Sequence, residues 1–271
     1  MDDDASGSER SILRTLDKGF SVYEVIASAG RRGISAGNLE QQLGYHRVTL
    51  GRFLRTFVTR GYVEEVPGAD RFRLSLKTLS LNFASLDGLP CREVGAPLLD
   101  ELWQRTRETV HLVMMDNGDV ITIDRLESEQ PLTLRTQVGA RRHAYCTAAG
   151  KAILAHLPES EVDRILSRGM PPIAVNTITD PTVYKQQLQG VRIEGYALDD
   201  EELADGIRCT ASPFFDYSGR VIGAVSLSAP CVRVSVEKLR IMAGAVRDTA
   251  LQLSRQLGYR SWGATEANTN R

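Results

Sequence analysis

Residues 34–60, ISAGNLEQQLGYHRVTLGRFLRTFVTR, predict two short helices joined by a tight turn. Ser35 is a good N-cap for the first helix, and Leu39 and Leu43 form one apolar stripe along it. Gly44 can end this helix, because glycine readily adopts the left-handed conformation found at helix C-termini. The second helix carries a wider stripe with the spacing of a core-facing surface: Leu50, Phe53, Leu54, Phe57 and Val58. The stretch therefore predicts a helix-turn-helix.

The opposite face of the second helix suits contact with DNA. A rotation of about 100° per residue places four side chains there, Val48, Arg52, Arg55 and Thr59. Arginine can bridge guanine or grip phosphate, and valine can meet a thymine methyl group. Ser35 and His46, which precede the two helices, are further DNA-binding candidates of this stretch. An ordinary solvated helix is the competing interpretation.

A hairpin follows directly, as in a winged helix. Two strand-like runs, 61–66 and 71–74, flank the turn-forming sequence PGAD. Arg71 and Arg73 would share one face of the second strand and contact phosphates. Residues 10–75 hold 11 Lys and Arg against 6 Asp and Glu, an excess of +5, whereas the whole chain has a net charge of −1. Such a local excess is expected of a surface that binds DNA.

The overall composition is that of a soluble protein with two ordinary domains. The chain has 271 residues, of which 42% are hydrophobic and 25% are charged. Its four cysteines are widely spaced without a CxxC pair, which argues against a zinc finger and a disulfide framework. No apolar run approaches the roughly 18 residues that cross a bilayer, and the acidic N-terminus lacks a secretory signal. We therefore expect a cytoplasmic protein without a membrane partner, cofactor or metal.

A linker helix and a second domain are expected after residue 75. Residues 76–90 hold an apolar stripe at helical spacing before the sequence DGLP ends the helix: Leu76, Leu79, Phe83 and Leu86. Residues 91–260 mix helices with strands in hairpins, which indicates an α+β domain rather than a doubly wound parallel sheet. The clearest hairpin joins strands at 110–115 and 120–125 through an Asn-Gly turn. Further strands are expected at 131–136, 207–214 and 221–228, with helices at 147–156 and 235–257 and a first helix that carries Val94, Leu98 and Leu102.

Three segments of the second domain supply parts for holding a small acid. Residues 140–151, ARRHAYCTAAGK, run from a loop into a helix of very small residues that starts at Thr147, where backbone N–H groups can meet an anion. Close packing of a helix on a sheet would explain the same small residues. Asp199 belongs to an acidic run, which is ordinarily a solvated loop. Ser226 and Ser228 alternate with apolar residues and would face either a pocket or a polar patch.

The same residues invite two other hypotheses. His143 and Cys146 can form the nucleophilic pair of an enzyme. Together with Asp199 and Cys209 they also offer the chemistry of a metal site. However, the chain shows no characteristic ligand spacing, nucleophile elbow or phosphate loop. We therefore expect no catalytic residue.

The chain resembles the IclR family of bacterial transcription regulators from about residue 12 to residue 258. The resemblance is carried by LGYHRVTLGRFLRTFVTRGYVE, ETVHLVMMDNGDVITIDRLES, VGARRHAYCTAAGKAILA and GYALDDEELADGIRCTASPFFDYSGRVIGAVSLSAP. Thr210 and Phe214 depart from the family signature, where an aliphatic residue is usual. His46 replaces a common proline before the second helix, which leaves the start of that helix less defined.

The resemblance implies a winged helix-turn-helix, a linker helix and a GAF-like effector-binding domain. It also implies a homodimer or homotetramer, with much of the dimer contact made by the DNA-binding domains. The DNA contacts would centre on Arg47, Thr49, Arg52 and Arg55. The effector pocket would include Leu134, Ala148, Ala149, Asp199, Ile207, Cys209, Ser226 and Ser228.

We therefore interpret the chain as a cytoplasmic bacterial regulator that binds double-stranded operator DNA as a symmetric homo-oligomer. A small carboxylic or aromatic acid bound in the second domain would change its affinity for the operator. A metal- or thiol-responsive regulator is the second interpretation, and a Cys/His enzyme is the third.

Overall fold

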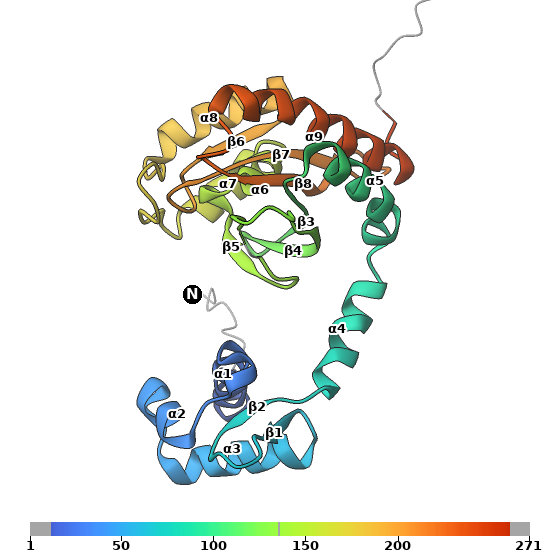
Figure 1. Cartoon of the computed structure of the whole chain (residues 1–271). Coiled ribbons are helices and arrows are strands. Elements are labelled where there is room, and N and C mark those ends of the chain that lie inside the picture. Colours follow the sequence, from blue (N-terminus) through green and yellow to red (C-terminus); the bar gives the residue numbers. More distant parts are fainter. Residues whose placement is uncertain (1–11, 135, 261–271) are drawn as a thin grey trace, which may run out of the picture. The chain divides into compact units, whose positions relative to one another are not determined.

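The computed structural model describes residues 12–134 and 136–260, and the chain divides into two compact units between Gly88 and Leu89. The side chains of residues 82 and 83 are not described, so Phe83 of the expected linker stripe lies outside the described residues. The first unit contains α1 (Arg14–Ser28), η1 (Gly30–Arg32), α2 (Ala36–Leu43), α3 (Arg47–Thr59), β1 (Val63–Glu65), β2 (Phe72–Leu74) and α4 (Lys77–Asp87) (Figure 1).

Within the described residues, the second unit has five α-helices, one short 3₁₀ turn and six strands. They are α5 (Pro90–Thr106), β3 (Thr109–Asp116), β4 (Asp119–Leu126), β5 (Arg141–His143), η2 (Ala144–Cys146), α6 (Ala148–Leu154), α7 (Glu159–Leu166), α8 (Pro181–Glu194), β6 (Ala197–Asp200), β7 (Ile207–Phe215), β8 (Val221–Pro230) and α9 (Val236–Gln256). None of the described helices is long and apolar enough to span a bilayer.

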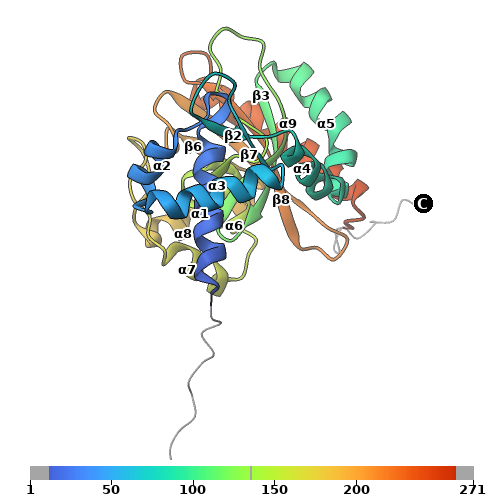
Figure 2. The ribbon, with the colours of Figure 1, turned by 90° about the horizontal axis from the view of Figure 1, so that it is seen from below.

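The helix-turn-helix packs around one small apolar core. Val22 and Ile26 of α1 are fully buried against Leu39 of α2 and Leu50 of α3. Both views show α1 and α3 crossing at a steep angle (Figures 1 and 2). The expected helices are confirmed, and Gly44 ends α2 in the left-handed conformation with φ 66°. The α1 helix was not among the expected elements, although it supplies part of this core.

The wing is a short antiparallel hairpin, in which Val63 pairs with Leu74. Its strands have three residues each, shorter than the sequence suggested, and Ile34 forms a bridge to Phe72 alongside them. The α4 helix ends at Asp87, as expected, because the next helix begins at Pro90, where proline fits a first turn.

The second unit is built on a six-stranded antiparallel sheet with the order β5-β4-β3-β8-β7-β6. The β3–β4 hairpin is confirmed, and its turn uses positive φ values of 52° at Asn117 and 85° at Gly118. The strand expected at 131–136 is wrong, because its described residues form no strand. The edge of β4 is paired instead with β5, part of a segment expected to be a loop. The 131–134 segment is tied down by single contacts, such as the one between the Thr133 and Thr109 hydroxyls.

Helices cover both faces of this sheet. The α5 and α9 helices pack together and contact one face, through β3 and β7 respectively, while α6 lies on the other face against β7 and β8 (Figure 1). An apolar core fills the space around α6, α7 and α8. The arrangement confirms the expected α+β class and is consistent with a GAF-like domain.

The α6 helix lies unusually close to the η2 turn that precedes it. A Cβ atom at Gly150 would stand 2.0 Å from the backbone oxygen of Ala144, a contact that no side-chain movement can relieve. Ala148, Ala149 and Ala152 of the same helix are buried. Close packing is thus one reason for the small residues of this segment.

We expect Gly150→Ala to lower the free energy of unfolding by about 3 kcal/mol, because the added methyl group must push α6 away from η2. Gly244→Ala in α9 is the matched control, since nothing lies within 4 Å of a Cβ there. The better helix propensity of alanine should stabilise the control by about 0.5–1 kcal/mol. Urea unfolding followed by circular dichroism measures both, and a Gly150→Ala variant as stable as the wild type would contradict the close approach.

Candidate functional site

The outer face of α3 is exposed and basic. Arg47, Arg52 and Arg55 are exposed together with Val48, while Thr49 is half-buried. The opposite face packs into the core, as the apolar stripe predicted. No ion pair among the described residues engages the three arginines. Their charges are therefore available to a polyanion.

Two expected DNA-binding side chains act as helix caps. The Ser35 hydroxyl accepts a hydrogen bond from the N–H of Asn38 at 3.2 Å, at the start of α2. His46 Nδ1 accepts one from the N–H of Val48 at 3.3 Å, at the start of α3. Because His46 caps α3, the helix has a defined beginning without the usual proline. Both side chains would meet DNA only from these capping positions.

The two wing arginines differ from each other. Arg73 forms an ion pair with Glu64 on the facing strand at 2.8 Å. Its guanidinium charge is therefore already neutralised and is not free for the expected contact with a DNA phosphate. The cause is the register of the hairpin, which places Glu64 directly opposite Arg73. Among the described residues, the Arg71 guanidinium donates only to the carbonyl of Arg32, at 3.4 Å.

The second unit has a cavity of about 470 Å³ beside the start of α6. The strand register explains its polar wall, because Asp199 of β6 pairs with Cys209 of β7, and Cys209 pairs with Ser228 of β8. The lining includes eight of the nine predicted pocket residues: Leu134, Thr147, Ala148, Ala149, Asp199, Cys209, Ser226 and Ser228. Ile207, the ninth, is not among the lining residues, because it lies at the first position of β7 and packs against the neighbouring apolar core.

The first turn of α6 offers backbone donors to the cavity. Thr147 accepts a hydrogen bond from the N–H of Gly150 at 3.0 Å, and its carbonyl accepts from Lys151 at 3.0 Å. None of the hydrogen bonds within residues 12–134 and 136–260 uses the N–H of Ala148 or Ala149, both of which line the cavity. These two groups and the helix dipole favour an anion at this point.

The carboxyl group of Asp199, on β6, is buried in the lining of the same cavity. Its Oδ1 accepts a hydrogen bond from the N–H of Glu202 at 2.8 Å. Burial raises the pKa of Asp199 to about 7 despite the nearby Lys151 ammonium group, which lowers it. Beside it, the Cys209 sulfur and the Ser228 hydroxyl are 3.1 Å apart. The polar wall thus offers hydroxyl, thiol and carboxyl groups.

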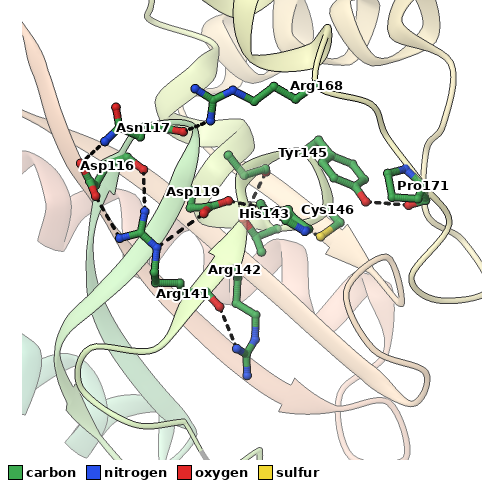
Figure 3. Close-up of polar contacts among 12 residues, drawn as sticks. Asp116, Asn117, Asp119, Arg141, Arg142, His143, Tyr145, Cys146, Arg168 and Pro171 are labelled. Atoms are coloured by element: carbon green, nitrogen blue, oxygen red, sulfur yellow. Dashed lines mark hydrogen bonds and ion pairs between the residues drawn. The ribbon is translucent and has the colours of Figure 1, made fainter. Parts of the chain in front are cut away.

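A network of ion pairs borders the cavity on β5 (Figure 3). Arg141 pairs with Asp116 at 2.9 Å and with Asp119 at 3.5 Å, and His143 Nδ1 lies 3.0 Å from Asp119. Figure 3 shows Arg142 leaving the strand in a different direction from Arg141. Its guanidinium donates to the Arg141 carbonyl at 2.8 Å. Within the described part of the chain it has no acidic partner.

The structure does not join His143 and Cys146 into a nucleophilic pair. The Cys146 thiol donates to the backbone carbonyl of His143 at 3.4 Å, whereas the His143 ring contacts Asp119 and stacks on Tyr145. Burial raises the pKa of Cys146 to about 12, so a reactive thiolate is disfavoured. Across the described residues, no group of three or more His, Cys, Asp or Glu side chains is placed to hold a metal ion.

Several lining residues escaped the sequence analysis. His111 and Val113 lie two residues apart on β3 and so share one face of the strand, and Thr122 of β4 lies opposite Val113. The period-two alternation of the hairpin strands was the signal that could have found them. His111 Nε2 lies 3.1 Å from the Thr136 hydroxyl, and burial lowers the pKa of His111 to about 4, so its ring is neutral.

A winged helix-turn-helix with a basic recognition face, followed by a unit with a ligand-sized cavity, defines a ligand-responsive class of DNA-binding proteins. The model of the IclR helix-turn-helix domain matches residues 15–67, and that of the bacterial transcriptional regulator IclR C-terminal domain matches residues 83–255. The chain therefore belongs to the IclR family of DNA-binding transcriptional regulators.

Relatives with curated names or solved structures agree. The HTH-type transcriptional regulator KdgR of Escherichia coli is 32% identical over 245 residues, which cover 90% of this chain and 93% of that protein. The IclR structure of Thermotoga maritima has a TM-score of 0.74 and 30% identity, and the match covers 92% of this chain and 100% of that one. An IclR homologue from Microbacterium hydrocarbonoxydans, solved with 4-hydroxybenzoate, shares the fold with a TM-score of 0.76 at 22% identity, over 90% of this chain and 98% of that one.

We expect Arg52→Ala to weaken binding to an operator selected from random duplexes by about 1–3 kcal/mol, because one arginine contact to a base edge is worth that much. Arg73→Ala is the matched control, since Glu64 already neutralises that charge. Arg73→Ala should therefore weaken binding to the selected operator far less than Arg52→Ala. Gel-shift titrations measure both, and an unchanged affinity of Arg52→Ala would remove Arg52 from the recognition face.

Proposed function

We propose that this protein is a cytoplasmic, homo-oligomeric regulator whose affinity for operator DNA is controlled by a small organic acid bound in the cavity of the second unit. The observation that carries this proposal concerns Ala148 and Ala149, which line the cavity and whose backbone N–H groups have no acceptor among the described residues. We assign no enzymatic activity to the chain, because the one candidate nucleophile, Cys146, is buried as a neutral thiol.

The cavity suits an acid with a compact apolar body. Its volume of about 470 Å³ falls within the range of about 300–1,000 Å³ that is typical of small-molecule sites. We place the carboxylate of the effector at the start of α6 and its remaining polar groups near Ser226 and Ser228. The relative that was solved with 4-hydroxybenzoate is an acid-binding protein of the same fold.

Arg142 supports an anionic ligand from the other end of the cavity. Its register partner is Val120, and cross-strand partners share a face of the sheet, so Arg142 lies on the cavity side. The neighbouring Arg141 is already paired with two carboxylates. We therefore propose that Arg142 attracts acids toward the cavity through its unpaired charge.

Ala149→Leu should abolish the response to the effector and leave operator binding intact, because the larger side chain fills the space where the carboxylate would lie. Ala96→Leu, at an exposed position of α5, is the matched control and should respond like the wild type. The measurement is operator release in a gel shift against a panel of organic acids. A wild-type response from Ala149→Leu would place the effector elsewhere in the second unit.

The first unit supports a homodimer. Leu13, Leu16 and Phe20 follow one another at helical spacing along α1, and Leu16 and Phe20 are 56% and 57% exposed. Leu76 and Leu79, at the start of α4, are exposed as well. A second copy of the chain is the occupant we propose for these apolar side chains, because a symmetric dimer also doubles the few base contacts of one recognition helix.

The protein should sediment as a dimer or larger assembly at micromolar concentration, and the double variant Leu16→Glu, Phe20→Glu should sediment with a lower mass. Charged side chains in the apolar contact would leave buried charges unpaired. Val175→Glu, on an exposed loop of the second unit, is the control. A wild-type protein that is monomeric and binds DNA one-to-one would contradict the proposed dimer.

A further inference from the structure

Three ionisable side chains are buried together at the polar wall of the cavity. Lys151 and Asp199 are each 1% exposed and Glu202 is 6% exposed. The Lys151 ammonium group forms an ion pair with Oε1 of Glu202, and Asp199 is held by the backbone N–H of Glu202. Oδ2 of Asp199 and Oε2 of Glu202 have no hydrogen-bond partner among the described residues. The cluster thus combines two carboxyl groups with one cation.

No other buried group compensates the second carboxylate. Cys209 of β7, Cys146 of η2 and Tyr184 of α8 all face the cluster, and burial raises the pKa of each, so they stay neutral. His111 of β3 stays neutral for the reason given above. The remaining charged or titratable groups of the cavity lie at its other end, on β4 and β5: Asp119, Arg141, Arg142 and His143. A buried carboxylate without a counter-ion is costly, and protonation removes that cost.

We propose that Asp199 holds a proton whenever an acidic effector occupies the cavity, and that this proton makes the cavity select anions over cations. Lys151 and Glu202 neutralise each other, so the wall is uncharged when Asp199 is protonated and negative when it is not. An anion at the start of α6 then meets no like charge. This inference rests on the proposed function only in taking an acid as the ligand of the cavity. Lys151 and Glu202 are positioning residues that act through Asp199.

The proposal makes effector binding depend on pH in one direction. Asp199 titrates in the effector-free protein with a pKa of about 7, and an anion nearby raises that value further. Binding an acid above this pH therefore takes up a proton. Between the pKa values of the free and the bound protein, the apparent affinity for an acid falls about tenfold per pH unit. A cationic ligand would show the opposite dependence.

Carbon NMR of the whole protein, labelled at the aspartate carboxyl carbons, tests this directly. Asp199→Asn removes one resonance and so assigns it. We expect that resonance to titrate near pH 7, while exposed aspartates titrate near 4. Sodium acetate, as the bare carboxylate probe, should raise the midpoint relative to sodium chloride of equal concentration. A midpoint near 4, or one that acetate lowers or leaves unchanged, overturns the proposal.

Two further variants separate charge from structure. Glu202→Gln leaves the Lys151 ammonium group unpaired beside Asp199 and should lower the Asp199 midpoint by at least one pH unit, whereas Glu202→Asp should restore it. Glu159→Gln, at an exposed position of α7, is the control and should leave the Asp199 midpoint unchanged. A Glu202→Gln midpoint equal to that of the wild type contradicts the charge argument. An ordinary titration of Asp199 would refute this inference alone, because the Ala149→Leu variant tests the effector site independently.

Discussion

The contact between α6 and η2, which requires a residue without a side chain at position 150, governs the geometry of the second unit. Because the helix begins against the sheet, its first N–H groups reach the cavity at Ala148 and Ala149. The same approach carries Lys151 into the interior, where an ammonium group must find a partner. Glu202 provides it, and its backbone in turn holds Asp199. One close packing contact thus organises both walls of the site.

The two walls have opposite electrical character. The start of α6 offers positive helix-dipole ends and free donors, while the other wall contains more carboxyl groups than cations. An acid can bind between them without repulsion only if the second carboxyl group, that of Asp199, is uncharged. Under our proposal, a balance among buried groups selects the charge of the ligand, and not the number of hydrogen-bonding side chains around the cavity.

Local signals in the sequence predicted most of the fold. Capping residues, apolar spacing and the Asn-Gly turn predicted the helix-turn-helix and the β3–β4 hairpin, and the family resemblance named seven of the residues that line the cavity. The sequence did not predict the edge strand β5, and it wrongly predicted a strand at 131–136, because sheet edges are decided by tertiary pairing. The α1 helix was missed as well. The pairing of Lys151 with Glu202, 51 residues apart, has no local signal at all. The ion pair of Arg73 with Glu64 has no local signal either, since only the strand register places Glu64 opposite Arg73.

We propose that an acid controls operator binding from the cavity beside α6. Nitrogen NMR of the alanine-labelled protein measures this most directly, with the Ala148 and Ala149 amide resonances followed during titration of an acid that alters operator binding. We expect both resonances to shift, with the same midpoint concentration as the change in operator affinity. An acid that alters operator affinity while both resonances stay in place would contradict it.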